Sequence, residues 1–350
     1  MRIIHLHDEP WDSGIAQYAL TLAGELGRRG HEIQFWAACG SHASRQAKRA
    51  GLETREMAGL GSILSLRREL LRRRADLLNP HTGSTQVLAL AASAGLDVPI
   101  VRTRADARPP RGGWPASLLA SRTRGFIAPN TRLEQALRRL FPGRSVALIP
   151  QGIDAPKDPP PLPVEPRIGI LGRLDPVKGH ELLLEAAVAL RDSQPRARFS
   201  AAGPPGARRD SLERFRDEVR SLRLEDRFEF LGFVPDRWSF IERCRIGVVA
   251  STGSEAVSRA GLEWMAMGRP LVAAKVGCLP DLVEHEETGL LFDPGDTRGL
   301  EEALSRLIQD TSLADRLGAA GRRRFESRYS LERFVQSTEA FYERLRNNPH

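Results

Sequence analysis

Residues 155–166 read APKDPPPLPVEP, and the next five residues, 167–171, read RIGIL. The first of these segments holds six prolines. Proline fixes φ and lacks an amide N–H, so neither a helix interior nor a central strand tolerates such a density. We therefore predict a stiff linker over 155–166. The apolar run that follows predicts that a second domain begins with a strand at Arg167.

The segments on both sides of this linker share one pattern. Ile3–Leu6 is a short apolar run that leads into a loop ending at Gly14, and apolar residues then recur with helical spacing over 15–26. Another apolar run follows at 33–37, and the second half repeats the same order over 167–190. Strand, loop, helix and strand in succession form the βαβ unit of a parallel sheet.

These repeats predict the α/β fold class, with two doubly wound Rossmann-like domains that face each other across a cleft. We place the domains at 1–154 and 167–328, and we expect a C-terminal helix over 329–350 to pack back on the first domain. A length of 350 residues suits two domains. Ligands of such sheets bind at the carboxyl ends of the strands, so we expect the site in the cleft.

Composition excludes several classes of protein. No apolar run reaches the ~20 residues needed to span a bilayer. The three cysteines lie far apart in the sequence, which argues against a disulfide framework or a zinc site and favours a reducing compartment. The segment Met1–Asp8 turns acidic after a short apolar run and lacks the long apolar region of a signal peptide. We therefore expect a cytoplasmic protein.

Positive charge is concentrated in the first half of the chain. Residues 1–155 hold 22 Lys and Arg against 13 Asp and Glu, whereas the whole chain has a net charge of +8. Such a surface suits an anionic partner, namely nucleic acid, an anionic membrane or a phosphorylated acceptor. A solvated arginine-rich surface is the alternative. Four of the 52 basic residues are lysines, so a retained lysine such as Lys178 suggests a position that needs a compact point charge.

The strongest functional pattern is the segment 251–255, which reads STGSE, followed by Glu263. An apolar strand precedes it, so we expect Ser254 to cap a helix over 255–267. Free N–H groups and the positive dipole end make a helix N-terminus an anion site. Glu263 would lie ~12 Å from Glu255 along one helix axis, so a nucleoside diphosphate sugar could touch both carboxylates. Two ordinary helix glutamates are the alternative.

A second pattern, GRLDPVKG at 172–179, lies between a predicted strand and a predicted helix. Gly172 permits close approach of the backbone to a ligand. Arg173 and Lys178 can converge on a diphosphate, the first as a planar fork and the second as a point charge. A loop with two solvated bases is the alternative. Gly14 before the first helix is a weaker phosphate signal, because GxGxxG spacing is missing there.

Together these segments resemble the family-4 retaining glycosyltransferases of GT-B fold over nearly the whole chain. The motifs that carry the resemblance are GRL and KG at 172–174 and 178–179, the two glutamates at 255 and 263, AMGRP at 266–270, and TGLLF with PGD at 288–292 and 294–296. RGHEI at 29–33 and IPQGID at 149–154 are weaker matches.

The resemblance implies that the domain at 1–154 is the acceptor side and that the domain at 167–328 binds the nucleotide sugar. It also implies a role for individual residues. Arg173 and Lys178 would hold the donor diphosphate, Glu263 would bind the ribose, and Glu255 would bind the donor sugar. His81 would contact the sugar from the first domain, although a structural histidine is the alternative. The residues assigned to catalysis are His81, Arg173, Lys178 and Glu255, and those assigned to substrate binding are Gly14, Gly172, Arg173, Lys178, Val234, Ser254, Glu255, Ala256, Val257 and Glu263. The resemblance implies no metal and no cofactor besides the donor substrate.

We therefore expect a retaining, metal-independent transferase that moves a sugar from a nucleoside diphosphate sugar to a saccharide or lipid-linked acceptor. Cell-surface polysaccharide or glycolipid synthesis is the expected setting. A nucleotide-sugar epimerase of related two-domain fold is the alternative. A nucleic-acid-binding protein is disfavoured, because the basic half lacks interleaved aromatic residues and any recognised motif.

The basic half also suggests peripheral contact with an anionic membrane at the inner face of the cell membrane. Residues 66–74 form a candidate basic amphipathic helix, with 62–66 as its apolar lead. Four arginines, at positions 102, 104, 108 and 111, precede a GGWP segment that we expect to be a mobile loop. The hypothesis is that these groups meet an anionic acceptor at the membrane surface.

Overall fold

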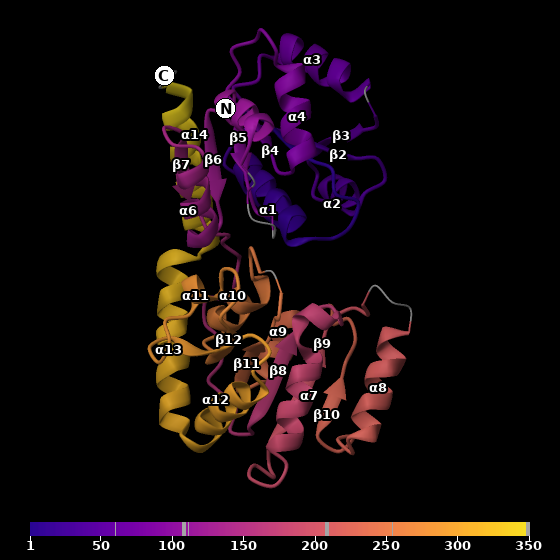
Figure 1. The fold of residues 1–350 in the computed structure, drawn as a ribbon, viewed down its shortest axis with the longest axis vertical. Coiled ribbons are helices and arrows are strands. Elements are labelled where there is room, and N and C mark those ends of the chain that lie inside the picture. The colour runs from indigo at the N-terminus through magenta and orange to yellow at the C-terminus, as the bar shows by residue number, and fades with distance from the viewer. Residues whose placement is uncertain (60, 107–109, 111, 207–209, 254, 348–350) are drawn as a thin grey trace. The chain divides into compact units, whose positions relative to one another are not determined.

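The computed structural model describes residues 1–59, 61–106, 110, 112–206, 210–253 and 255–347. The chain divides into two compact units. Unit 1 comprises Met1–Gly152 together with the C-terminal stretch from Leu331, and unit 2 comprises Ile153–Ser330. Figure 1 labels the helices and strands of both units.

Unit 1 is built on parallel strands with helices between them. Its strands are β1 (Arg2–His7), β2 (Glu32–Ala38), β3 (Glu53–Met57), β4 (Leu77–Pro80), β5 (Val101–Thr103), β6 (Gly125–Ala128) and β7 (Ser145–Leu148). Its helices are α1 (Gly14–Arg28), α2 (His42–Arg49), α3 (Gly61–Arg73), α4 (Gly83–Ala92), α5 (Trp114–Ser121), α6 (Thr131–Leu140) and α14 (Leu331–Asn347). The strand orders are β3-β2-β1-β4 and β5-β6-β7, and a parallel bridge between Leu78 and Ile100 joins the two sheets.

The core of unit 1 follows the apolar pattern of its sequence. Every residue of β1 after Arg2 is buried, as expected for a parallel strand covered on both faces. Helix α14 packs on α1, where the rings of Tyr18 and Phe334 meet edge to face at 4.8 Å between centroids. Arg29 and His31 both contact the Glu339 carboxylate, at 2.7 and 2.9 Å. The C-terminal helix is therefore an integral part of unit 1.

Unit 2 is a single six-stranded parallel sheet. Its strands are β8 (Arg167–Leu171), β9 (Arg198–Ala202), β10 (Phe228–Phe230), β11 (Ile246–Val249), β12 (Leu271–Ala274) and β13 (Gly289–Phe292). Its helices are η1 (Pro176–Lys178), α7 (His180–Ala189), α8 (Ser211–Ser221), α9 (Arg237–Glu242), α10 (Arg259–Ala266), α11 (Leu279–Leu282), α12 (Thr297–Gln309) and α13 (Thr311–Arg328). The strand order β10-β9-β8-β11-β12-β13 reverses direction between β8 and β11. Ligands of doubly wound sheets bind at such a reversal.

The proline-rich segment 155–166 contains no helix or strand and is hydrogen-bonded to other residues of unit 2. Arginine side chains hold its carbonyl groups at three points. Arg269 donates to Pro160 at 2.9 Å and Arg245 to Pro163 at 2.7 Å. Arg322 donates to the Lys157 carbonyl at 3.0 Å. The segment therefore belongs to unit 2, and the chain passes between the units at positions 152–153 and 330–331.

Among the described residues, no helix combines the length and the apolar character required to span a bilayer.

Candidate functional site

The loops that follow β8 and β11 meet at the strand reversal of unit 2. Thr252 donates its amide N–H to the Val177 carbonyl at 3.0 Å. Gly179 has a φ of +75°, and a Cβ at this position would lie 2.0 Å from the Ala250 carbonyl oxygen. Glycine alone fits both this backbone conformation and this close approach. Contact between the two loops therefore requires a glycine at position 179, directly after Lys178.

This contact brings Lys178 to Glu255. The Lys178 ammonium lies 2.5 Å from the Glu255 carboxylate oxygen Oε1, and the Ser251 hydroxyl donates to the same oxygen at 2.5 Å. The Glu255 side chain is 4% exposed, whereas the Lys178 side chain is 32% exposed. The site therefore presents a partly accessible cation that is held in place by a buried carboxylate.

The backbone of Glu255 departs from the sequence-based expectation. Its carbonyl oxygen accepts a hydrogen bond from the amide of Cys278 at 2.7 Å, so the chain is held outside a helical path. Helix α10 begins at Arg259, and Ser258 occupies the N-cap position. The prediction of one helix over 255–267 is therefore wrong, as is the placement of Glu255 and Glu263 on one axis. Ser254, the predicted cap, lies outside the described residues.

Glu263 does lie on α10, and its side chain is 7% exposed. Two guanidinium groups meet its Oε1 oxygen, with the Nε atoms of Arg237 and Arg259 at 2.7 and 3.0 Å. Burial raises the pKa of the Glu263 carboxyl, and the two arginines oppose this shift. Sequence reasoning missed both arginines. The four-residue spacing of Arg259 and Glu263 is a signal for the first, but Arg237 comes from another helix.

The remaining residues predicted for the donor surround these groups in unit 2. Arg173 is about half exposed, and its guanidinium is bonded to Asp175. Gly172 follows β8 directly and donates its amide to the Ala202 carbonyl at 3.0 Å. Val234 is partly buried and packs against the apolar cluster around Trp264. Ala256 and Val257 are partly buried and lie between Glu255 and α10.

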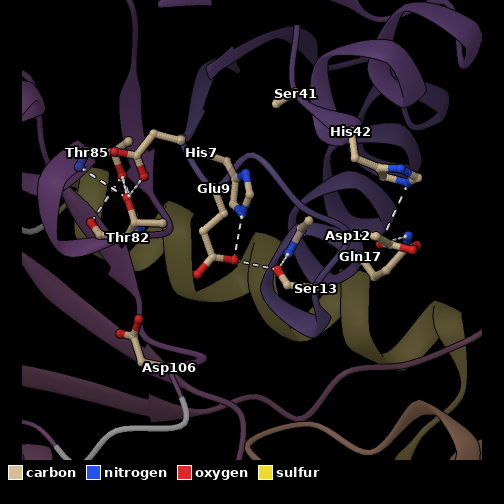
Figure 2. A network of polar contacts seen from close by, with 12 residues as sticks. His7, Glu9, Asp12, Ser13, Gln17, Ser41, His42, Thr82, Thr85 and Asp106 are labelled. Carbon is tan, nitrogen blue, oxygen red and sulfur yellow. Dashed lines mark hydrogen bonds and ion pairs between the residues drawn. The ribbon is translucent and has the colours of Figure 1, made fainter. Parts of the chain in front are cut away.

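Unit 1 has its own strand reversal, between β1 and β4, where polar side chains form a network (Figure 2). The Asp8 carboxylate accepts hydrogen bonds from the hydroxyls of Thr82, at 2.5 Å, and Ser84. The Glu9 carboxylate accepts one from Ser13 at 2.5 Å and lies 3.7 Å from the His7 ring. The neighbouring His7 ring lowers the pKa of Glu9, and burial partly offsets this shift.

Gly14 is the first residue of α1, at the edge of this network. Ser13 directly before it is the N-cap, and its hydroxyl accepts from the Ala16 amide at 3.1 Å. The structure therefore places Gly14 at a helix start on the strand-reversal side of unit 1, as the sequence pattern predicts.

His81 is fully buried rather than directed toward open space. Its Nε2 atom lies 3.1 Å from Nδ1 of His5, and the two rings stack at 5.4 Å between centroids. Burial is the largest cause that holds the pKa of His81 well below its ordinary value, so the ring is neutral at pH 7. Within unit 1 this burial favours the structural histidine that the sequence left as the alternative, and contact of His81 with a sugar stays a prediction.

Two further expectations for unit 1 are corrected. Arg102 is 1% exposed, and its guanidinium donates to the carbonyls of Pro80 and Thr103 and to Asp106. These internal hydrogen bonds occupy the guanidinium group, so Arg102 does not bind an external anion. The GGWP segment is not a loop throughout, because Trp114 begins helix α5. Arg108 and Arg111 lie outside the described residues.

Two family models match consecutive parts of the chain. The model described as Glycosyltransferase Family 4 matches residues 13–157, and the model described as Glycosyl transferases group 1 matches residues 165–310. D-inositol 3-phosphate glycosyltransferase of Corynebacterium glutamicum is 31% identical over 154 residues, which are 43% of this chain and 37% of that protein. Glycogen synthase of Mycobacterium tuberculosis is 26% identical over 334 residues, 89% of this chain and 76% of that protein. The chain thus spans little more than a third of the first of these relatives.

Solved structures of similar fold cover both units. HepE of Anabaena in complex with UDP has a TM-score of 0.86 and 20% identity, over 98% of this chain and 100% of that chain. Sucrose-phosphate synthase of Thermosynechococcus elongatus has a TM-score of 0.76 and 21% identity, over 99% of each chain. This likeness confirms the predicted α/β fold class with two Rossmann-like domains.

Proposed function

The chain belongs to the group 1, family-4 glycosyltransferases of GT-B fold, and we propose that it moves a sugar from a nucleoside diphosphate sugar to a saccharide or lipid-linked acceptor. We further propose that the transfer retains the anomeric configuration, needs no metal ion, and serves cell-surface polysaccharide or glycolipid synthesis. Action at the inner face of the cell membrane is part of this proposal.

One observation carries the proposed donor site. Lys178 and Glu255 come from two loops that meet at the strand reversal of unit 2, where parallel sheets bind ligands. Arg173 stands on the first of these loops, so two cations are available to an incoming diphosphate. The structurally similar HepE binds UDP and UDP-glucose, which supports the choice of a nucleotide sugar as donor.

Each part of the nucleotide sugar would then contact its own set of residues. In this proposal the diphosphate lies against Arg173 and Lys178, with Gly172 allowing its approach, while Glu263 accepts hydrogen bonds from the ribose hydroxyls. Glu255 and the backbone amides of Ala256 and Val257 hold the sugar. Val234 borders the base, and Gly14 of unit 1 admits the phosphates.

Catalysis would rest on stabilising the departing diphosphate. The bond between sugar C1 and the donor phosphate oxygen breaks while C1 bonds to the acceptor oxygen on the same face. The acceptor proton passes to the departing diphosphate. Fixed cations aimed at developing negative charge commonly contribute more to the rate of such reactions than any other single effect. Of the two cations proposed for the diphosphate, Lys178 is the one that pairs with a buried carboxylate.

Thermal denaturation of the full chain with a panel of UDP-, GDP- and ADP-sugars tests the donor class. We expect one nucleotide series to raise Tm, since a ligand of the native state stabilises it. Release of the nucleotide should then require an acceptor. Conversion of the donor without an acceptor would instead establish the epimerase alternative, and no response to any nucleotide sugar would refute the proposal.

A further inference from the structure

Helices α3, α4 and α5 follow one another across the same face of the unit 1 sheet. The chain passes from β3 to β4, β5 and β6 in one direction, and right-handed crossovers place the connecting helices on one side. Arg67 of α3 donates to the carbonyls of Ala92 and Ala94 at 3.1 and 2.7 Å. Gln86 of α4 donates to the Thr123 hydroxyl beyond α5 at 2.9 Å. Figure 1 shows α3 beside α4.

Large apolar side chains are exposed along all three helices. The exposed fractions are 61% for Leu64 and 59% for Leu71 on α3, 50% for Val87 on α4, and 77% for Trp114 and 54% for Leu118 on α5. Helices α4 and α5 contain no charged residue. The outward side of a solvated helix usually carries charged residues. Large apolar side chains exposed on neighbouring helices indicate a site of interaction.

Arginines border this apolar surface on two sides. Arg68 and Arg72 lie on the exposed side of α3, and Arg122 directly follows α5. None of these three side chains makes an ion pair with another described residue. Glu69, the acidic residue of α3, is buried and paired with Arg73. The three helices therefore present apolar groups and unpaired cations without an exposed carboxylate of their own.

We propose that the surface formed by Leu64, Leu71, Val87, Trp114 and Leu118, here named the α3–α5 face, docks onto an anionic membrane. A bilayer surface offers an apolar boundary for tryptophan and leucine and phosphate groups for the bordering arginines. A second copy of the chain fits less well, since a symmetric contact would turn the arginine borders toward one another. Docking of this face would bring the enzyme to a lipid-linked acceptor, and in that respect the inference rests on the proposed function.

Vesicle co-sedimentation of the full chain tests the docking without donor or acceptor. We expect binding to phosphatidylcholine vesicles that contain phosphatidylglycerol, weaker binding to phosphatidylcholine alone, and loss of binding as salt is raised. The double variant Arg68→Gln/Arg72→Gln should weaken binding about fivefold for each arginine removed. Trp114→Ser should weaken it roughly tenfold, because a large apolar side chain no longer enters the interface.

Matched controls lie on unit 2. Arg298→Gln removes an exposed helix arginine, and Val164→Ser removes an exposed apolar side chain, so neither should change vesicle binding. No binding to anionic vesicles at low salt would overturn the proposal, as would equal losses in the controls. Self-association that Trp114→Ser abolishes would assign the face to a second copy instead. Nucleotide-dependent thermal shifts, run in parallel, report on the proposed transferase function separately.

Discussion

The two strand reversals of this molecule share one topology but differ in the chemistry that they carry. At the reversal of unit 2, carboxylates are paired with cations, as Lys178 with Glu255 and two arginines with Glu263 show. At the reversal of unit 1, the carboxylates of Asp8 and Glu9 are held mainly by hydroxyl groups. A diphosphate can compete with a carboxylate for a cation, whereas a sugar hydroxyl can replace a serine or threonine hydroxyl.

The comparison also locates the excess positive charge of the first half. The polar network at the unit 1 reversal contains the carboxylates of Asp8 and Glu9, and the nearby Arg102 is buried and paired with Asp106. An anionic acceptor would therefore meet carboxylates there. The α3–α5 face, by contrast, is bordered by Arg68, Arg72 and Arg122, which form no ion pair with another described residue. These three unpaired arginines thus lie beside the helical surface and not in the polar network of the strand reversal.

Lys178→Ala tests the unit 2 side of the comparison most severely. Loss of a cation aimed at the departing diphosphate should lower kcat by about 10²- to 10³-fold, as for removal of other fixed transition-state donors. Steady-state kinetics at saturating donor measure this effect. Lys178→Arg keeps the charge and should retain more activity than Lys178→Ala, and equal losses in both variants would refute a role for the charge itself.

Gly179→Ala tests whether the contact between the two loops is required. A Cβ at this position would overlap the Ala250 carbonyl, in a backbone conformation that alanine disfavours. We expect the free energy of unfolding to fall by at least ~2 kcal/mol, together with loss of donor binding. Gly295→Ala is the matched control, because Gly295 has a φ of +80° with nothing within 4 Å of the added Cβ. Equal destabilisation of both variants would show that backbone strain alone explains the effect.

The strand–loop–helix order at the start of each unit could be predicted from the sequence because it depends on local periodicity. The basic helix predicted at 66–74 is likewise present as part of α3, which ends at Arg73. What the sequence could not indicate depends on distant partners. Cys278 holds the Glu255 carbonyl away from a helix, and Arg237 reaches Glu263 from a separate helix. Burial of His81 and Arg102 similarly depends on neighbours far along the chain, which no spacing rule identifies.

Glu263→Gln separates binding from stability in unit 2. Two ribose hydroxyls would lose a charged acceptor, so nucleotide affinity should fall roughly tenfold or more, measured by calorimetry. Because burial raises the folded-state pKa of Glu263 above its ordinary value of 4.5, the wild type loses stability as pH rises through this raised value. The glutamine variant lacks this titration. The free energy of unfolding of the wild type should therefore fall relative to that of the variant between pH 4.5 and pH 7.

Asp8→Asn tests the unit 1 side, where the smallest effect is expected. Asparagine still accepts a hydroxyl hydrogen bond but carries no charge, so acceptor binding should weaken by ~1 kcal/mol, about a fivefold rise in acceptor KM. Donor KM should not change, because Asp8 lies in the unit that does not hold the proposed diphosphate ligands.

Asp12→Asn is the matched control for this variant, since Asp12 is on the same loop, is exposed, and is bonded to Gln17. If Asp8→Asn weakens donor binding as strongly as acceptor binding, then the unit 1 reversal does not serve the acceptor. The contrast between the two reversals would then reflect how each unit folds and not separate binding of acceptor and donor. If acceptor KM alone rises, the hydroxyl-bonded carboxylates of unit 1 and the cation-bonded carboxylates of unit 2 recognise different substrates.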